Sequence, residues 1–432
     1  MKKASEPFHP ERESDQALKR AGIRSAFLFV NFFLIITAYY HLKPASRSLF
    51  IESLGADRLP YVWIGTALTM IAFIGYYNRL VARRSRLGVV LGSCIVSIGL
   101  LLLFRFFLGK SLPFISVCFY IFVDMLGVIL VEQFWSLTDT IYTTGEGKSW
   151  YGLVGTGGLL GGVTGGAAAA FLIKKTPLKT ADLLLVAAFI IFLILILAGI
   201  MGRLGLYREA VPSASPGQKR VGWRGWHHNR YVLLIAALLL LAQLVSPIVE
   251  FQFLKTVGTA YQDLEARTAF LGTFFSVLGL VSIAVNLGVT PIVHRTLGAV
   301  AGLLVQPLTV IFCSWGFMLQ PTLSMIAVTK IGDRGLSYSI NRASRELLYI
   351  PIDPIMVYQA KAWIDMFGYR LFKVSGSLLI LLSTQWLPIK LTLVQLSWLT
   401  LGICGLWIVA IAILRRDYHV VLNSRPLRAV NH

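Results

Sequence analysis

The chain has 432 residues, of which 56% are hydrophobic and only 14% are charged, and its mean hydropathy is +0.71. This composition excludes one or two soluble domains of the same length and indicates an integral membrane protein. The formal net charge of +20 does not indicate nucleic-acid binding, because the basic residues are spread over many short loops and not gathered in one polar domain with interleaved aromatic residues.

The amino-terminal region predicts a membrane helix that the protein retains. The first two dozen residues are polar, and the apolar run that follows has no small-residue cleavage site, so we expect no cleavable signal peptide. Apolar windows of about 20 residues predict about twelve membrane-spanning helices along the chain. These windows cover residues 25–42, 61–79, 88–109, 113–135, 151–173, 182–203, 231–253, 268–290, 297–319, 321–340, 366–388 and 391–414.

The predicted helices form two groups of six. The longest interior polar segment, 204–230, contains a run of proline, serine and glycine and is typical of a linker. We therefore expect an all-α polytopic membrane protein with an amino-terminal six-helix half (1–203), a cytoplasmic linker (204–230) and a carboxy-terminal six-helix half (231–432). This layout is typical of major-facilitator-type transporters, whose substrate site lies near the bilayer midplane between the halves.

The loops predict the orientation of the chain. If the amino terminus is cytoplasmic, the cytoplasmic segments hold most of the lysine and arginine residues outside the predicted helices. We therefore expect a multi-pass protein of the inner (cell) membrane with both termini in the cytoplasm.

Glycines mark the predicted fifth helix. Gly158, Gly162 and Gly166 are spaced four residues apart, which permits close approach of helix backbones in a membrane. Tight helix packing is the favoured interpretation, and sliding at a moving interface is the alternative.

The sequence holds no motif for catalysis or metal binding. Residues 147–149, GKS, resemble the end of a phosphate-binding P-loop, but the required glycine is replaced by Tyr142 and a membrane helix precedes the segment where a strand is needed. The four cysteines lie in apolar runs without metal-ligand spacing, and no HExxH, GxSxG or CxxC pair occurs. We therefore expect no enzymatic activity, no cofactor and no metal site.

Charged residues lie at bilayer depth within residues 330–377. Ionised groups persist there only against a partner, a water-filled cavity or an anionic ligand. Arg370 and Lys373 are three residues apart and share one face of a predicted helix, so they form a candidate anion clamp, with snorkelling to the interface as the alternative. Lys361 and Asp365 are four residues apart, a spacing that favours a mutual salt bridge.

Two ungapped blocks resemble a known family. Residues 134–155, FWSLTDTIYTTGEGKSWYGLVG, resemble the family sequence FWGFANQI…EAKRFYPLFG. Residues 349–377, YIPIDPIMVYQAKAWIDMFGYRLFKVSGS, resemble YIPLD…KGKAAIDVVGxRLGKSGGS. A weaker match, VE…WK in the family, surrounds Glu250 and Lys255. The family is that of the ATP/ADP translocases of plastids and obligate intracellular bacteria, which are related to the major facilitators.

The resemblance implies a transporter that exchanges ATP for ADP, or moves other nucleotides, by alternating access. The charged positions that match the family are Glu146, Lys148, Glu250, Glu346, Asp353, Lys361, Asp365, Arg370 and Lys373. With the charges at bilayer depth, they give a candidate substrate-binding set of Lys43, Arg47, Glu250, Lys255, Lys330, Arg334, Glu346, Arg370 and Lys373. The candidate structural or gating set is Glu146, Lys148, Asp353, Lys361 and Asp365.

Three departures from the family pattern concern charge. The family's basic-acidic pair after the first helix is Ser46-Arg47 here, with Lys43 upstream, and an acidic position of the family motif FDxTKE is Arg342. A further lysine of the second block is Val357. These changes favour membership of the family over an identical substrate.

The leading hypothesis is a transporter that exchanges nucleotides or a related phosphorylated anion. Fixed cations in a water-filled cavity of low dielectric constant attract phosphates strongly, and acidic partners such as Asp124 and Glu250 would hold those cations while the site is empty. We expect Lys43 or Arg47 of the first half and Arg370 or Lys373 of the second half to line a central cavity.

Other classes of protein remain as alternatives. They are a major-facilitator transporter of another organic anion or lipid, a membrane enzyme acting on lipid phosphates, and a non-transporting membrane scaffold. The enzyme is disfavoured because no nucleophile–base pair appears, and the scaffold because buried charges would then be costly without use. The expected partners are a phosphorylated small anion and the lipid bilayer, and not nucleic acid.

Overall fold

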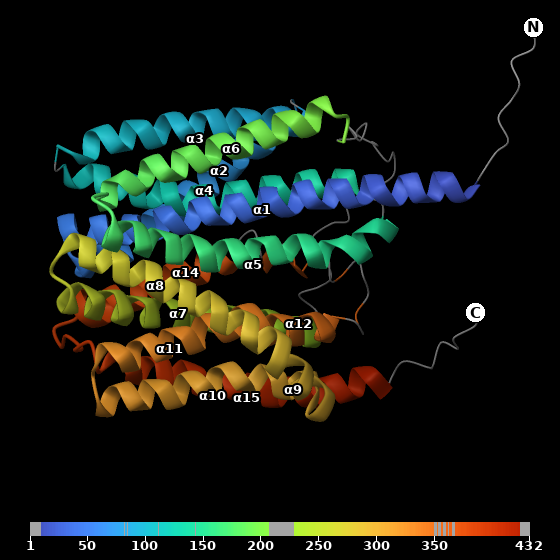
Figure 1. Ribbon diagram of the computed structural model, residues 1–432. Helices are drawn as coiled ribbons and strands as arrows, with labels where there is room; N and C mark the ends of the chain where they lie inside the picture. The colour runs from blue at the N-terminus through green and yellow to red at the C-terminus, as the bar shows by residue number, and fades with distance from the viewer. Residues whose placement is uncertain are drawn as a thin grey trace, which may run out of the picture.

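The structure is a computed structural model in which the described elements are all helices. It describes residues 10–423 except 82, 84, 111, 143, 207–228, 350–351, 353–355, 357–359, 362 and 365–367. Most of the predicted linker therefore lies outside the described residues. The helices run along one common direction, and the start of the first helix and the end of the last lie at the same end of the bundle (Figure 1).

The first group of long helices precedes the linker. Its bounds are α1 Pro10–Leu54, α2 Leu59–Val81, α3 Arg86–Leu108, α4 Pro113–Ile141, α5 Thr144–Lys175 and α6 Leu183–Arg203. The short helix η1, Ala56–Arg58, joins α1 to α2, and η2, Thr180–Asp182, precedes α6. Local sequence explains several starts: Pro113 supplies the first turn of α4, where its missing N–H is not needed, and the Ser85 side chain accepts a hydrogen bond from Gly88 N at the start of α3.

The second group follows the linker. Its bounds are α7 Arg230–Ala260, α8 Leu264–Ala284, α9 Thr290–Thr296, α10 Gly298–Leu319, α11 Leu323–Leu336, α12 Arg342–Tyr349, α14 Tyr369–Leu381 and α15 Leu396–Asn423. Three π-helical segments whose residues are all described extend helices of this group: Val285–Val289 (η4) between α8 and α9, Ser337–Asn341 (η5) between α11 and α12, and Leu382–Trp386 (η7) after α14. Pro291 accounts for the first of these breaks, because it cannot donate a backbone hydrogen bond to the preceding turn.

The predicted helices are present. Ten helical stretches within the described residues are long and apolar enough to cross a membrane, and the protein is a multi-pass all-α membrane protein. The two other predicted spans, 321–340 and 366–388, contain α11 with η5 and α14 with η7. These helices are less apolar because their charged side chains line an internal cavity.

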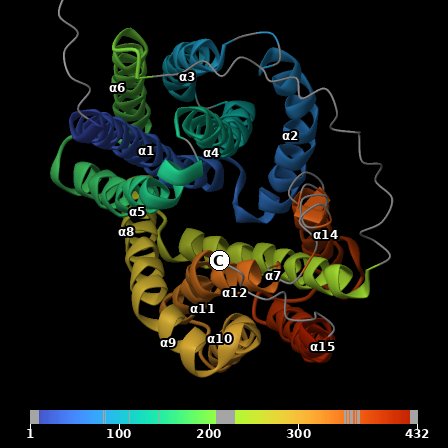
Figure 2. The same cartoon turned by 90° about the vertical axis from the view of Figure 1, so that its right-hand side faces the viewer.

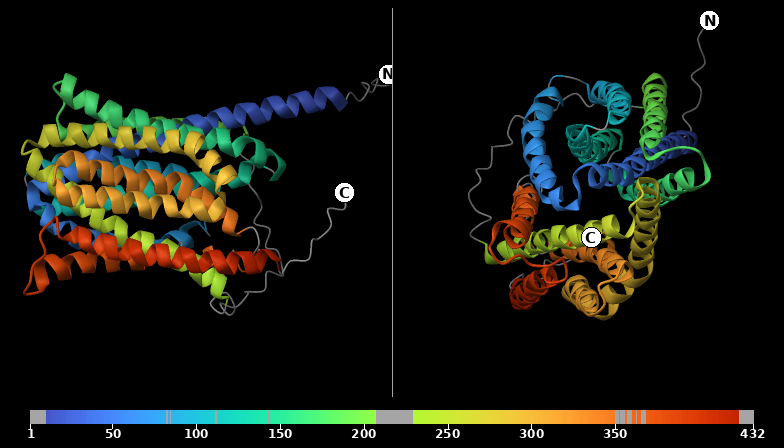
Figure 3. Two further views of the ribbon diagram at one scale, coloured as in Figure 1. Left: turned by 90° about the horizontal axis from the view of Figure 1, so that it is seen from below. Right: turned by 90° about the vertical axis from the view of Figure 1, so that its left-hand side faces the viewer.

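Each group of helices has its own hydrophobic core. One cluster, which includes Leu28, Phe119 and Ile191, joins α1, α3, α4, α5 and α6, and a second, which includes Val249 and Trp407, joins α7, α10, α12 and α15. A third cluster, with Phe50 and Phe251 among its members, packs residues of both groups together. Seen along the bundle axis, α1–α6 lie on one side and α7–α15 on the other (Figures 2 and 3).

Helix α5 contacts both groups through its glycines. A Cβ atom at Gly166 would lie 2.7 Å from the carbonyl oxygen of Gly272 in α8, and one at Gly158 would overlap the ring of Phe32 in α1. Gly162 has more room, since its nearest neighbours would lie 3.5 Å away. The close helix approach predicted from the glycine spacing is therefore confirmed, and at Gly166 it joins the first group to the second.

Candidate functional site

A cavity of about 330 Å³ lies between the two groups of helices. Its walls come from α1, α2 and α4 of the first group and from α7, α8, α11, η5 and α14 of the second. Within the described part of the chain, eight charged side chains line it, six cations and two carboxylates. The cations are Lys43, Arg47, Lys330, Arg334, Arg370 and Lys373, and the carboxylates are Asp124 and Glu250.

On the first group, Arg47 is fixed by its neighbours. Its Nη2 donates to Asp124 Oδ1 at 2.5 Å, and its Nη1 donates to Ser46 Oγ at 2.8 Å. The guanidinium lies 4.4 Å from the ring centre of Tyr120, and only 6% of the side chain is exposed. The carboxylate and the aromatic ring hold the buried guanidinium of Arg47 in one position in the cavity wall.

On the second group, Lys330 is the matching buried cation. Its side chain is 1% exposed and forms an ion pair with Glu250, and its Nζ lies 3.5 Å from Asp333 Oδ2. Asp333 is held in turn by Ser246 Oγ at 2.7 Å and by Gln306 Nε2, which donates to the Asp333 backbone carbonyl at 3.0 Å. This network behind the wall compensates the charge of Lys330, as a lysine buried to this extent requires.

Lys43 lies among aromatic rings. Its Nζ is 4.2 Å from the ring centre of Phe275 in α8 and 5.3 Å and 5.7 Å from those of Tyr40 and Tyr39. The faces of aromatic rings attract cations and leave the ammonium able to meet an anion on its other side. Because Phe275 belongs to the second group, this contact also spans the cavity.

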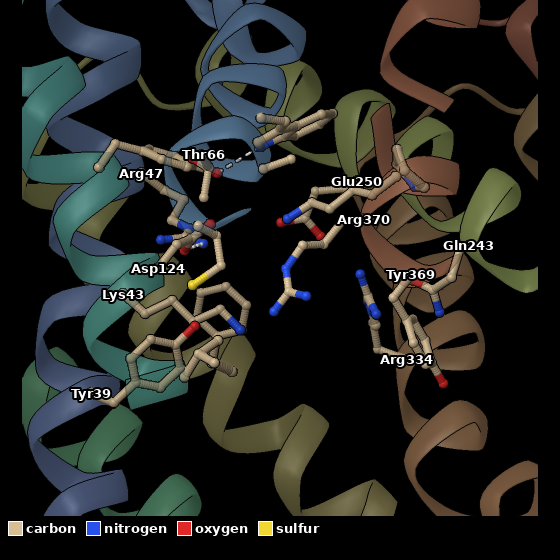
Figure 4. A pocket seen from close by; sticks show the side chains of 18 of the residues that line it. Tyr39, Lys43, Arg47, Thr66, Asp124, Gln243, Glu250, Arg334, Tyr369 and Arg370 are labelled. Carbon is tan, nitrogen blue, oxygen red and sulfur yellow. Dashed lines mark hydrogen bonds and ion pairs between the residues drawn. The ribbon is translucent and has the colours of Figure 1, made fainter. Parts of the chain in front are cut away.

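Arg370 and Lys373 line the cavity from the same face of α14, as their spacing predicts. Figure 4 shows the guanidinium of Arg370 pointing into the cavity, between the Arg47–Asp124 pair and Arg334. Arg334 lies 3.8 Å from Asp333 Oδ2 through its Nε. Since cations outnumber carboxylates among its described wall residues, the cavity attracts anions, and the low dielectric constant around it strengthens that attraction.

Two predicted binding residues lie outside the cavity. Lys255 forms an ion pair with Asp57 of η1 at 2.6 Å, near the end of the bundle. Glu346 in α12 is 59% exposed and pairs with Lys361 at 2.7 Å. The fold brings Lys361 to Glu346. Its predicted pairing with Asp365 stays a prediction, because Asp365 lies outside the described residues.

The structure leaves some of the predicted residues undescribed. Asp353 and Asp365 lie outside the described residues. Glu146 and Lys148 lie in the first two turns of α5, and their side chains are also outside the described part. The remaining predicted residues, seven of the candidate binding set, are brought together by the cavity.

Sequence reasoning missed the aromatic part of the site. Several aromatic side chains line the cavity between its charged groups: Tyr39, Tyr40, Trp63, Tyr120, Phe275, Tyr338 and Tyr369. In an apolar helix such residues are indistinguishable from core residues, so composition gives no signal. The only available clue was their spacing, since Tyr39 and Tyr40 precede Lys43 by four and three residues and share its helix face.

Comparison with known proteins agrees with the site. The chain is 23% identical to the ADP,ATP carrier protein 1 of Chlamydia muridarum over 454 aligned residues, which cover 86% of each chain. It is 24% identical to the ADP,ATP carrier protein 1 of Rickettsia prowazekii over 348 residues, which cover 71% of this chain and 69% of the carrier. The family model for the TLC ATP/ADP transporter matches residues 319–418, a range that contains the cavity cations of α11 and α14. By these matches the chain is similar to the ATP/ADP translocase family.

Solved transporter structures share the fold of this chain. A bacterial homologue of the iron transporter ferroportin, in an inward-facing state, is 13% identical with a TM-score of 0.65, and the match covers 91% of this chain and 98% of that one. The nucleoside transporter NupG is also 13% identical, with a TM-score of 0.59 over 93% of this chain and all of its own. These likenesses confirm the predicted all-α, major-facilitator-like membrane fold.

Proposed function

We propose that this protein exchanges nucleotides, of the ATP/ADP type, across a membrane by alternating access. The observation that carries the proposal is the cavity between the two groups of helices, which gathers six cations from α1, α11 and α14 around two carboxylates. Because a polyphosphate carries several negative charges on one small molecule, it is the class of ligand that these cations attract most strongly. The relatives named ADP,ATP carrier proteins support the same substrate class.

The cations have different roles in this proposal. Arg47 and Lys330 are each compensated by a carboxylate, so they shape the walls of the cavity in its empty state. Arg370 and Lys373 are the clamp for phosphate oxygens. Lys43, which rests on aromatic rings, moves toward the bound anion.

The uncharged part of the cavity suits the remainder of a nucleotide. Aromatic side chains such as Tyr39 and Tyr40 offer stacking surfaces for a planar ring system. A volume of about 330 Å³ lies within the range of small-molecule sites, which runs from about 300 to 1,000 Å³. Lys255 and Glu346, which lie outside the cavity, have no part in binding and belong with the ion pairs that hold helices together.

The proposal includes the setting of the protein. The two groups of helices, 1–203 and 231–432, act as the two moving halves, joined by the 204–230 linker. The chain lies in the inner (cell) membrane with both termini in the cytoplasm, acts as a transporter and not as an enzyme, and has no nucleic-acid partner. The excess of lysine and arginine in the loops at the termini end supports this orientation.

Uptake into proteoliposomes tests this function. Vesicles that contain the purified protein and are preloaded with unlabelled ADP should take up labelled ATP, while empty vesicles should take up much less, because exchange requires a counter-substrate. Labelled ATP uptake that is no faster than in protein-free vesicles would refute the proposal.

A panel of other anions tests the substrate class. The departures at Arg47, Arg342 and Val357 change the charge pattern of the family motif, so a related phosphorylated anion is the second candidate. Other nucleotides and inorganic phosphate are therefore offered in the same assay. Uptake of one of them in place of ATP would support the second candidate and refute the first.

A further inference from the structure

Among the described residues, most of the hydrogen bonds and ion pairs that join the two groups of helices lie at one end of the bundle. This end, which we call the η1 end, holds η1, η2, the carboxy-terminal end of α7 and the start of α8, and it lies opposite the termini (Figure 1). The right panel of Figure 3 looks onto it. Two separate clusters of side chains span the groups there, one around Arg267 and one around Asp57.

Arg267, in the first turn of α8, is the centre of the first cluster. Its side chain is only 3% exposed, and it donates to the backbone carbonyl of Ser48 at 3.2 Å and to Glu52 Oε2 at 3.1 Å, both in α1. It also donates to the carbonyls of Tyr261 at 3.0 Å and Gln262 at 2.9 Å, which precede it in its own group. One guanidinium thus uses two bonds to hold α1 and two to stay on its own group.

Asp57, in η1, is the centre of the second cluster. Its carboxylate pairs with Lys255 of α7 at 2.6 Å, and its backbone carbonyl accepts from Gln385 Nε2 of η7 at 2.8 Å. Gln385 Oε1 also accepts from the Tyr61 hydroxyl of α2 at 3.1 Å, and Trp386 Nε1 donates to the same hydroxyl at 3.3 Å. The corner between α1 and α2 is therefore tied to two helices of the other group.

The Arg267 cluster lies directly beyond the cavity along α1, on the side of the η1 end. Arg47 lines the cavity, Ser48 follows it directly, and Glu52 lies about one turn beyond Ser48 along α1.

Between described residues, the other hydrogen bonds that cross the groups are those of Thr180 with Glu265 and Thr268 at the same end, and that of Ser276 with the Val163 carbonyl in the middle of α5. None joins two described residues of opposite groups at the termini end.

We propose that Arg267 and Lys255 are gate residues, which close the cavity at the η1 end and must release α1 and η1 before substrate can pass there. This role rests on the alternating access of the proposed function, but it concerns residues outside the binding cavity. With the termini in the cytoplasm, the η1 end faces the outside.

The geometry explains how such a gate opens at low cost. When α1 moves away, Arg267 keeps its bonds to Tyr261 and Gln262, so the guanidinium is not left without partners. The acidic partners, Glu52 and Asp57, are 49% and 63% exposed, so water already solvates them and replaces the lost ion pairs. The free-energy cost of breaking these bonds is therefore low.

Accessibility of a cysteine in the cavity tests the gate. Thr66, an uncharged cavity residue of α2, is changed to cysteine (Thr66→Cys) in a chain whose four native cysteines are replaced by alanine. A membrane-impermeant maleimide is then applied to spheroplasts and, separately, to inverted vesicles, with the face that carries the carboxy terminus as the reference. The test variant carries Arg267→Gln and Lys255→Gln together.

Opposite changes at the two faces are the expected result. In the test variant, labelling of the Thr66→Cys site should rise roughly tenfold from the face opposite the carboxy terminus and fall from the face that carries it, since the population shifts toward the state open at the η1 end. The control is Arg105→Gln, which breaks the pair with Asp182 at the same end but inside the first group and should change neither rate.

Two outcomes would overturn the gate. One is unchanged labelling from both faces in a folded variant, and the other is a rise from both faces, which indicates general loosening of the structure. Because the labelling needs no nucleotide, its result is separate from that of the uptake assay: a working gate in a protein that fails to transport ATP would refute the substrate and keep the gate.

Discussion

Replacement of Arg370 is the most direct test of the proposed phosphate clamp. Arg370→Ala removes a guanidinium that lines the cavity beside Lys373 and points toward its middle. A charge-assisted hydrogen bond to phosphate contributes about 1.5–3 kcal/mol, so the apparent Kd for ATP should rise roughly ten- to a hundredfold.

The size of the loss should depend on the charge of the ligand. At a separation of about 8 Å and an effective dielectric constant of about 20, each unit of phosphate charge interacts with a cation by about 2 kcal/mol before screening by salt. The loss for ATP should therefore exceed the loss for AMP. Arg370→Lys keeps the charge but not the two-pronged guanidinium, so its Kd for ATP should lie between those of the wild type and the alanine variant.

Nucleotide binding to the purified protein, measured by calorimetry beside thermal unfolding, is the assay. Arg105→Ala is the matched control, because it removes a cation that pairs with Asp182 outside the cavity. An Arg370→Ala protein that unfolds at the wild-type temperature and binds ATP with unchanged affinity would refute the clamp. A variant that expresses poorly and unfolds at a lower temperature would instead assign Arg370 a structural role.

Two further predictions concern stability and helix contact. Asp124→Asn leaves the buried guanidinium of Arg47 without its carboxylate, so the free energy of unfolding should fall by about 3–5 kcal/mol, and Tm should fall with it in a thermal unfolding experiment; an unchanged Tm would contradict the role of this pair. Gly166→Ala places a Cβ atom 2.7 Å from the Gly272 carbonyl oxygen, so it should separate α5 from α8 and lower both Tm and the exchange rate in proteoliposomes. Gly155→Ala, where no atom lies within 4 Å of the added carbon, is its control, and equal behaviour of the two variants would refute the argument.

The sequence predicted the helices because the bilayer imposes a length and a composition on them. Each of the twelve predicted windows contains a helix of the structure, including the two that are rich in charge. The same argument found Lys330, Arg334, Arg370 and Lys373, since a charge inside a membrane-spanning segment must face a cavity or a partner.

Residues near the ends of helices were assigned less well. Lys255 lies five residues after Glu250 in α7, which places it more than one turn closer to the end of the bundle and on a different helix face. Whether such a residue reaches the cavity depends on the length of α7 and on the side chains that contact the residue. A hydropathy window predicts neither of these. Glu346 was misplaced for a similar reason, because it follows the π-helical segment η5 that separates α12 from α11.

The π-helical segments give the second group a mechanical property that the first lacks in its described part. A π turn interrupts the regular i to i−4 ladder, so the helix can bend there at little cost in hydrogen bonding. The π-helical segment Val285–Val289 follows α8, which carries Arg267, and separates it from α9 at the termini end. One continuous rod would transmit every displacement of the η1 end to the opposite end. A helix interrupted in this way lets the part that carries Arg267 move while α9 stays in place.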